Sequence, residues 1–164
     1  MLKIYSGTEK DHFLLDALGA PSVLAPAKTQ TTSYDHKDSI YVLFQDDETG
    51  ARIRLRLNPM TSPNQVRDML QYRVSAYEKP YIWECSALSF GDERIEPTPA
   101  LYKKLMEALS EVRARHHMGT LLFLTKTSRI AGMKGIGKFP FLTILPVDKK
   151  GELSLALLPG AYHH

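Results

Sequence analysis

The chain has 164 residues, of which 43% are apolar and 24% charged, the composition of a globular domain large enough for one hydrophobic core. Its single cysteine, Cys85, excludes an internal disulfide framework and a multi-cysteine zinc site. No apolar run approaches the roughly 18 residues that a membrane span needs, and the opening MLKIYSGTEKDHF lacks the apolar core of a signal peptide. We therefore expect a single cytoplasmic domain over 1–164 with no membrane partner.

Charge is uneven along the chain, whose formal net charge is +3. Residues 1–102 hold 11 Lys and Arg against 14 Asp and Glu, whereas residues 103–164 hold 10 against 4. This C-terminal part could attract nucleic acid, a phosphate-bearing ligand or an acidic protein, and the simpler interpretation is a solvated surface kept for solubility. Its cations are Lys103, Lys104, Arg113, Arg115, Lys126, Arg129, Lys134, Lys138, Lys149 and Lys150.

The first half of the chain predicts three strands and one helix. Residues 2–5 favour a short strand, and residues 9–18 favour a helix that Gly19 and Pro21 would end. Residues 19–38 are rich in Pro, Thr and Ser and predict a long loop. Residues 39–45 and 51–57 are β-branched or strictly alternating, and the turn between them predicts an antiparallel hairpin.

The second half predicts helices alternating with strands. Ser62-Pro63 and Thr98-Pro99 each place a cap and a proline before an apolar stripe, so we expect helices from 62 to 77 and from 98 to Gly119. Residues 81–90 form the most apolar strand, which we expect to be central. Strands over 120–125, 140–146 and 152–158 and a short helix over 128–134 complete an α/β (α+β) mixed sheet with helices on its faces.

Glu84 is the first candidate for chemistry. It lies inside YIWECSALSF, between Trp83 and Cys85, on the strand expected to be central. A carboxylate that loses its solvation there becomes a stronger base and can take a proton near neutral pH. The simpler alternatives are a structural glutamate satisfied by a buried arginine, or one at the exposed end of the strand.

Two further sets of charged residues precede it. Asp35 and Asp38 come just before the strand over 39–45 and could hold a cationic substrate, although aspartate also favours turns. Arg52, Arg54 and Arg56 share one face of the next strand, where they could bind a carboxylate or phosphate or form the wet face of a hairpin. We expect these carboxylates, one arginine and the buried glutamate to form one ion-pair network around a cleft.

The order of these motifs resembles the acyl-homoserine-lactone synthase (autoinducer synthase) family. The matching text runs from YDHKDSIYVLFQDDETGARIRLRLNP through PYIWECSALSF, and the likeness extends over roughly residues 34–145. The family has Asp-x-x-Asp before a strand, then Arg-Leu-x-Pro, then Trp-Glu-x-Ser. Here these motifs are Asp35 and Asp38, residues 56–59, and residues 83–86.

The resemblance implies a GNAT-like acyltransferase fold with a mostly antiparallel central sheet. It implies transfer of an acyl chain from acyl carrier protein to the amine of S-adenosylmethionine or a related amino compound, as in autoinducer synthesis for quorum sensing. The resemblance implies no cofactor or metal beyond these substrates. It also implies that the basic C-terminal part docks the acidic carrier protein. The implied catalytic residues are Glu84, Asp35 and Asp38, and the implied substrate-binding residues are Arg56, Trp83, Ser86 and Arg54.

The chain also departs from the family. Ala87 stands where the family's Glu-x-x-Arg-Phe has its arginine, no arginine precedes Arg52, and residues 1–33 form a divergent N-terminal segment. Two other interpretations therefore stay open. One is an acyl-CoA-dependent N-acyltransferase of the GNAT type, although the acidic GDERIEPT stands where a glycine-rich pyrophosphate-binding run would be needed. The other is a non-catalytic descendant that binds an acyl ligand or a protein.

An acyl ligand would need an apolar site. Leu122, Leu124, Phe141 and Leu142 could line a tunnel for the acyl chain, or could be plain core.

Overall fold

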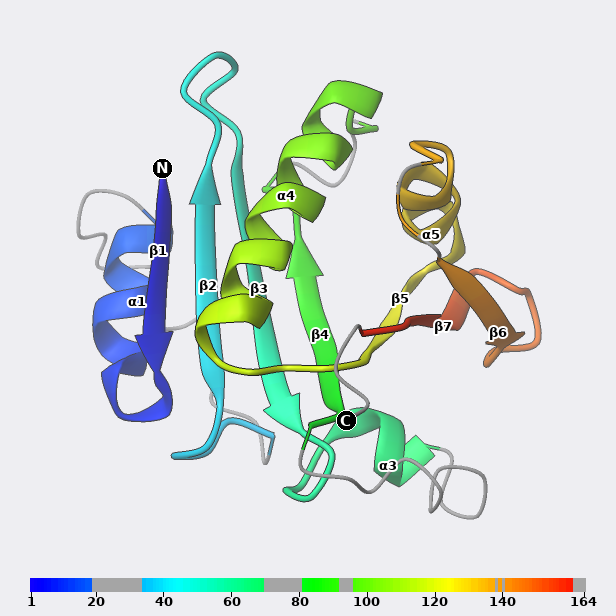
Figure 1. Cartoon of the computed structure of the whole chain (residues 1–164), viewed down its shortest axis with the longest axis horizontal. Coiled ribbons are helices and arrows are strands. Elements are labelled where there is room, and N and C mark those ends of the chain that lie inside the picture. The colour runs from blue at the N-terminus through cyan, green and yellow to red at the C-terminus, as the bar shows by residue number, and fades with distance from the viewer. Residues whose placement is uncertain (19–33, 70–80, 92–95, 138, 140, 161–164) are drawn as a thin grey trace.

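A computed structural model describes residues 1–18, 34–69, 81–91, 96–137, 139 and 141–160. Seven strands and four helices are described, together with one short 3-10 turn over Gly7–Glu9 (Figure 1). The strands are β1 (Leu2–Ser6), β2 (Ile40–Gln45), β3 (Arg52–Pro59), β4 (Trp83–Ser89), β5 (Leu121–Lys126), β6 (Leu142–Pro146) and β7 (Leu153–Leu158). The helices are α1 (Lys10–Leu18), α3 (Gln65–Met69), α4 (Pro99–Arg115) and α5 (Thr127–Lys134). Residues 19–33 of the loop predicted over 19–38, and the continuation of the 62–77 helix beyond residue 69, lie outside the described residues.

The strands form one sheet in the order β1-β2-β3-β4-β5-β7-β6. Every neighbouring pair is antiparallel except β4 and β5, which are parallel. The predicted α/β (α+β) fold with a mixed, mostly antiparallel sheet is therefore confirmed, as are the β2–β3 hairpin and the central place of β4. The sequence did not reveal that β7 inserts between β5 and β6.

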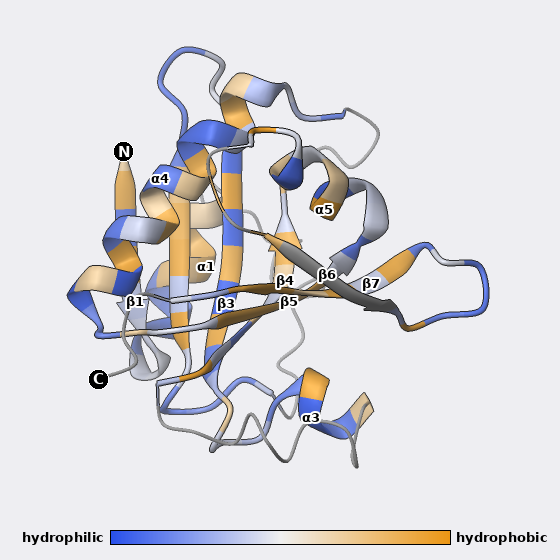
Figure 2. Ribbon diagram, turned by 45° about the vertical axis from the view of Figure 1, so that its right-hand side comes forward, coloured by the Kyte–Doolittle hydropathy of each residue, from blue (hydrophilic) through white to orange (hydrophobic). Residues whose placement is uncertain are grey.

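Helices cover both faces of the sheet, because the strands alternate in polarity. β3 is banded in Figure 2, with Ile53, Leu55 and Leu57 turned to one side and the arginines to the other. The apolar side of β3 packs in the main core with α4 and α5. Two smaller clusters lie on the opposite face, one with α1 and Tyr41, the other with α3 and Leu122. The polar side chains of β3 and β4 lie between these two clusters.

The central strand carries a bulge. A three-residue step on β4, from Ser86 to Ser89, lies opposite the two-residue step from Arg56 to Arg54 on β3, and Ala87 has a φ of 53°. A left-handed residue in a bulged strand re-aims the strand after it. Ala87, where the family that the motifs resemble has arginine, is thus an exposed corner of β4.

Two predicted helix boundaries need correction. The side chain of Asn64, not Ser62, caps α3, because its Oδ1 accepts from the Arg67 N–H at 2.8 Å. Helix α4 ends at Arg115 rather than at Gly119, and His117 takes the left-handed conformation with a φ of 53°. The apolar stripe of this segment shows that it is helical but does not show at which residue the helix ends.

The four leucine and phenylalanine residues proposed for a tunnel do not line one space. Leu122 and Leu124 pack in the cluster with Val66, whereas Phe141 packs in the main core on the other face. The side chain of Leu142 lies outside what the structure describes. The described members are therefore core residues of two different layers.

No helix in the described part of the chain is long and apolar enough to span a membrane.

The end of α4 makes a stability prediction. The Met118 N–H donates to the Arg113 carbonyl at 2.9 Å across His117, the geometry that glycine favours. His117→Gly removes the steric cost of the left-handed conformation and should stabilise the protein by about 1 kcal/mol, which raises Tm by roughly 2–4 °C. His116→Gly is the control, because His116 has a φ of −108° and gains nothing from glycine. An equal or lower Tm for His117→Gly would contradict the prediction.

Candidate active site

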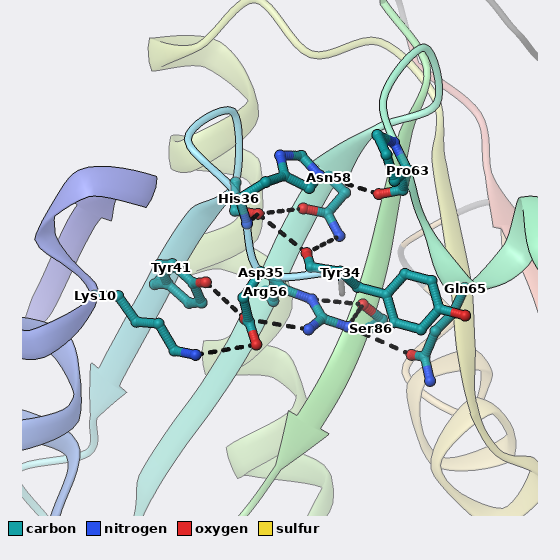
Figure 3. A network of polar contacts seen from close by, with 11 residues as sticks. Lys10, Tyr34, Asp35, His36, Tyr41, Arg56, Asn58, Pro63, Gln65 and Ser86 are labelled. Carbon is teal, nitrogen blue, oxygen red and sulfur yellow. Dashed lines mark hydrogen bonds and ion pairs between the residues drawn. The ribbon is translucent and has the colours of Figure 1, made fainter. Parts of the chain in front are cut away.

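Asp35 is bound by side chains from three elements (Figure 3). Lys10 of α1 lies 3.0 Å from its Oδ2, Arg56 of β3 lies 3.2 Å from its Oδ1, and the Tyr41 hydroxyl of β2 donates to Oδ1 at 2.6 Å. The Asp35 and Arg56 side chains are only 8% and 6% exposed, so water screens this pair weakly. Burial and the bond to Asp35 raise the pKa of Tyr41, which therefore stays a neutral donor.

The segment that carries Asp35 is tied to the sheet by Asn58. The Asn58 amide donates to the Tyr34 carbonyl at 3.1 Å and accepts from the Ser39 hydroxyl at 2.6 Å. The Tyr34 ring lies over the Arg56 guanidinium at 5.7 Å, and its hydroxyl donates to Asp68 at 2.9 Å. That bond raises the pKa of Tyr34. Asp35, which the sequence also allowed as a turn residue, is thus held by its own side chain and by the hydrogen bond to the carbonyl of Tyr34 before it.

Arg56 continues the network onto the central strand. Its Nε and Nη2 donate to the Ser86 hydroxyl oxygen at 3.3 and 3.0 Å, and Nη2 also reaches Gln65 of α3 at 3.5 Å. The pairing of β3 with β4 sets Arg56 directly opposite Ser86. Arginine suits this place because its planar fork offers several donors at fixed angles.

Glu84 lies two residues before Ser86 on the same face of β4 and is fully buried. Its Oε2 accepts from the Val66 N–H at 2.8 Å, while its Oε1 has no hydrogen-bond partner among the described residues. A buried polar atom without a partner costs about 1–3 kcal/mol or more when charged, so it points to a functional role. No direct contact joins Glu84 to Asp35 in the described structure.

The remaining predicted site residues lie elsewhere. Asp38 is exposed, accepts from the Ser62 hydroxyl at 3.3 Å and contacts neither Arg56 nor Glu84 in the described structure. It borders a surface hollow of about 430 Å³ beside the end of α4. Trp83 packs against the main core on the opposite face, because it neighbours Glu84 in an extended strand.

Arg54 lies on the same face of β3 as Arg56, two residues before it in the strand. No side-chain hydrogen bond or ion pair involving it is found in the described ranges. The predicted single network therefore contains Asp35, Arg56 and Ser86, with Glu84 beside it, and excludes Asp38, Trp83 and Arg54.

Sequence reasoning missed several members of the site. Lys10, Tyr34, Tyr41, Asn58 and Gln65 all contact it, and each looks like an ordinary surface or strand residue in the sequence. One signal was available for Asn58, a polar residue ending the alternating strand on the arginine face. Nothing near residue 10 indicates a contact with residue 35.

Part of the basic C-terminal sequence is internal. Arg129 is buried over the Phe90 ring at 4.8 Å and contacts Glu96, and Arg113 donates to the carbonyls of Gly119 and Pro159. Lys104 bonds Asp46 at 2.9 Å and Glu48 at 3.1 Å. The exposed cations are Lys103, Arg115, Lys126, Lys134, Lys149 and Lys150, and Lys138 lies outside the described residues.

The arrangement offers a base beside a rigid cation. Glu84 presents a buried and unbonded carboxylate oxygen, which can accept a proton from a group placed against it. Cys85 faces the main core, and burial raises the pKa of its thiol, so it is not a nucleophile. Within the described ranges no three His, Cys, Asp or Glu side chains cluster as metal ligands would.

No protein-family model matches the sequence, and no curated protein matches it. Solved structures do share its fold. The acyl-homoserine-lactone synthase LasI superposes with a TM-score of 0.69 at 18% identity, covering 97% of this chain and 89% of its own. BjaI, a CoA-dependent acyl-homoserine lactone synthase solved with SAM and isopentyl-CoA, gives 0.67 at 20% identity, covering 97% and 82%. An acyl-CoA N-acyltransferase from Pseudomonas aeruginosa gives 0.51 at 11% identity, covering 95% and 97%.

These likenesses show the fold. The fold that the motifs around Asp35 and Glu84 implied is therefore confirmed, and the superposition with LasI covers 97% of the chain.

Removing the Asp35 charge should destabilise the protein. Asp35→Asn keeps the shape but takes away the carboxylate that faces both Lys10 and Arg56, so we expect a loss of about 3 kcal/mol in the free energy of unfolding by urea. Asp38→Asn is the matched control and should change that free energy by less than about 0.5 kcal/mol. Equal effects of the two substitutions would show that the network does not stabilise the fold.

The bond from Lys104 predicts an acid-sensitive contribution. The Lys104 ammonium and the Thr49 hydroxyl lower the pKa of Asp46 from its ordinary value of 3.8 to about 2. The resulting stabilisation is complete above the unfolded-state pKa and is lost as the pH falls from about 4 to about 2. Asp46→Asn should therefore flatten the dependence of Tm on pH in that range, whereas Asp47→Asn at the exposed neighbour should keep the wild-type slope.

Proposed function

We propose that this protein is an N-acyltransferase of the acyl-homoserine-lactone synthase type. It would take an acyl chain from the thioester of acyl carrier protein and place it on the amine of S-adenosylmethionine or a related amino compound. The observation that carries the proposal is Glu84, a buried glutamate on the central strand with one carboxylate oxygen unbonded. The shared fold with LasI and BjaI supports the class of reaction.

The site chemistry fits transfer to an amine. An amino group is protonated near neutral pH and must lose a proton before its lone pair attacks a carbonyl carbon. Glu84 takes that proton at Oε1, the neutral amine attacks the thioester carbon, and collapse of the intermediate breaks the C–S bond and releases the thiol. The proposed lactone step then closes the amino acid onto its own carboxylate and expels methylthioadenosine. Each step uses only the two substrates, so we propose that no cofactor or metal is needed.

The charged network orients the base. The Val66 N–H holds the Glu84 carboxylate by its Oε2. Asp35 with Lys10 fixes Arg56, which binds Ser86 two residues further along the same strand. We assign Asp35 to positioning. Asp38 and Arg54 are proposed at most at the rim of the acceptor site, because they contact none of these groups in the described structure.

The donor is proposed to be a carrier protein. Exposed cations in the second half of the chain, such as Lys103, Lys149 and Lys150, can attract an acidic partner. Glu96, at the start of α4, places a negative charge where a CoA diphosphate would need positive groups. We propose a cytoplasmic setting because both substrates are cytoplasmic metabolites. An acyl-CoA donor remains the second candidate because BjaI, with the same fold, is CoA-dependent.

The test is a matched assay of donors and acceptors. Purified protein is incubated with S-adenosylmethionine and acyl carrier protein thioesters of several chain lengths, with the acyl-CoA series in parallel. Thiol release and methylthioadenosine are followed by mass spectrometry. Wild type should release both products, and Glu84→Gln, which keeps the shape but cannot take the proton, should lower the rate by about 10²–10⁴-fold.

The control is Glu152→Gln, because Glu152 is an exposed glutamate on the β6–β7 hairpin and should keep the wild-type rate. Thiol release that needs another amine would change the acceptor and keep the acyltransferase. Release from acyl-CoA alone would select the second donor. A folded protein that releases no thiol with any donor would refute the proposal and favour a non-catalytic acyl-binding protein.

A further inference from the structure

Ser86 has an uncommitted hydroxyl proton. A serine hydroxyl has two lone pairs and one O–H. Its Oγ accepts from Arg56 twice, through Nε at 3.3 Å and Nη2 at 3.0 Å, so both lone pairs are occupied. Among the described residues no acceptor lies in hydrogen-bond contact with the O–H. Ser86 is fully buried, so bulk water does not satisfy it either.

The guanidinium makes this hydroxyl a stronger donor. Hydrogen bonds accepted from a cation draw electron density from the oxygen and strengthen the bond that its own hydrogen can make. Asp35 and Lys10 keep the Arg56 side chain in the place that this requires. The fold therefore sets the position of this polarised O–H, through residues from α1, β3 and the segment before β2.

The place of Ser86 in the sheet decides where this donor points. Arg56 lies on the β3 side of β4, as Figure 3 shows, so the tetrahedral oxygen turns its hydrogen away from β3. On the other side, β4 pairs with β5 only from Trp83–Leu121 to Cys85–Phe123, while both strands continue beyond that point. Ser86 is thus the first residue of β4 past the paired part, with Glu84 two residues away on the same face.

We propose that the Ser86 hydroxyl is a catalytic oxyanion donor, which binds the carbonyl oxygen of an acyl thioester and stabilises the negative charge that develops on it. This inference rests on the proposed function and assigns one more catalytic residue to its site. An acceptor on Glu84 and a donor on Ser86 would then lie on either side of the reacting carbon, one for the amine proton and one for the carbonyl oxygen.

The step balances as follows. The amine nitrogen forms a bond to the thioester carbon, the C=O π pair moves to oxygen, and the oxyanion accepts the Ser86 O–H hydrogen bond without taking its proton. The ammonium gives its first proton to Glu84 Oε1 before this attack. The oxygen pair then re-forms C=O, the C–S bond breaks, and the departing thiolate takes the second proton of the attacking nitrogen and leaves as the thiol. Donors held in advance at such a position are each worth about 10²–10³ in kcat.

Two measurements test the proposal. The first is the infrared carbonyl band of bound hexanoyl-pantetheine labelled with ¹³C at the carbonyl carbon, which reports the hydrogen bond without any turnover. The band should shift to lower frequency with wild type and with Ser86→Thr, which keeps a hydroxyl, and should lose this shift with Ser86→Ala. The second is steady-state kinetics, in which Ser86→Ala should lower kcat by about 10²–10³-fold with little change in KM, and Ser86→Thr should restore part of it.

Ser89→Ala is the matched control, because the Ser89 hydroxyl lies past the bulge, accepts from the Gly91 N–H and contacts no arginine in the described structure. Thermal unfolding of each variant confirms that it is folded. An unchanged band shift in folded Ser86→Ala, or no bound carbonyl band with wild type, overturns the proposal. A shift that depends on Ser86 in a protein that acylates no amine would uphold the donor and refute the proposed function, so the two failures are distinguishable.

Discussion

The buried carboxylate of Asp35 ties helix α1 and the segment before β2 to the β2–β3 hairpin. Helix α1, strand β2 and strand β3 each contribute one side chain to it, through Lys10, Tyr41 and Arg56. Taking a carboxylate and a guanidinium out of water is costly, and only good geometry and further hydrogen bonds offset that cost. Here those bonds also fix Ser86, so the same interaction orders the face of the sheet where chemistry is proposed.

A polar layer between two apolar clusters explains how this face is stable. The α1 cluster around Tyr41 and the α3 cluster around Leu122 exclude water on either side of the network. Low local polarity strengthens each hydrogen bond that is made and penalises each one that is not. The unbonded oxygen of Glu84 stands out for that reason, since Asp35, Arg56 and Ser86 in the same layer are bonded to one another.

The central strand connects this layer to the proposed reaction. Strand β4 carries Glu84 and Ser86, then a bulge at Ala87, and its pairing with β5 ends just before Ser86. Bulges that change the direction of a strand are common next to active sites, where they re-aim side chains. The exposed corner at Ala87 lies outside the buried network of Asp35 and Arg56.

The sequence by itself determined the elements and the main chemical groups. Apolar periodicity located β2, β3, α4 and β5, because alternation and helical stripes are local properties, and the motif order indicated the acyl-homoserine-lactone synthase fold around Asp35, Arg56 and Glu84. Only the tertiary structure decided which charges meet. Asp35 and Asp38 are alike in sequence, yet one is buried against Lys10 and the other is exposed, because contacts between residues far apart in the chain depend on the packing of whole elements.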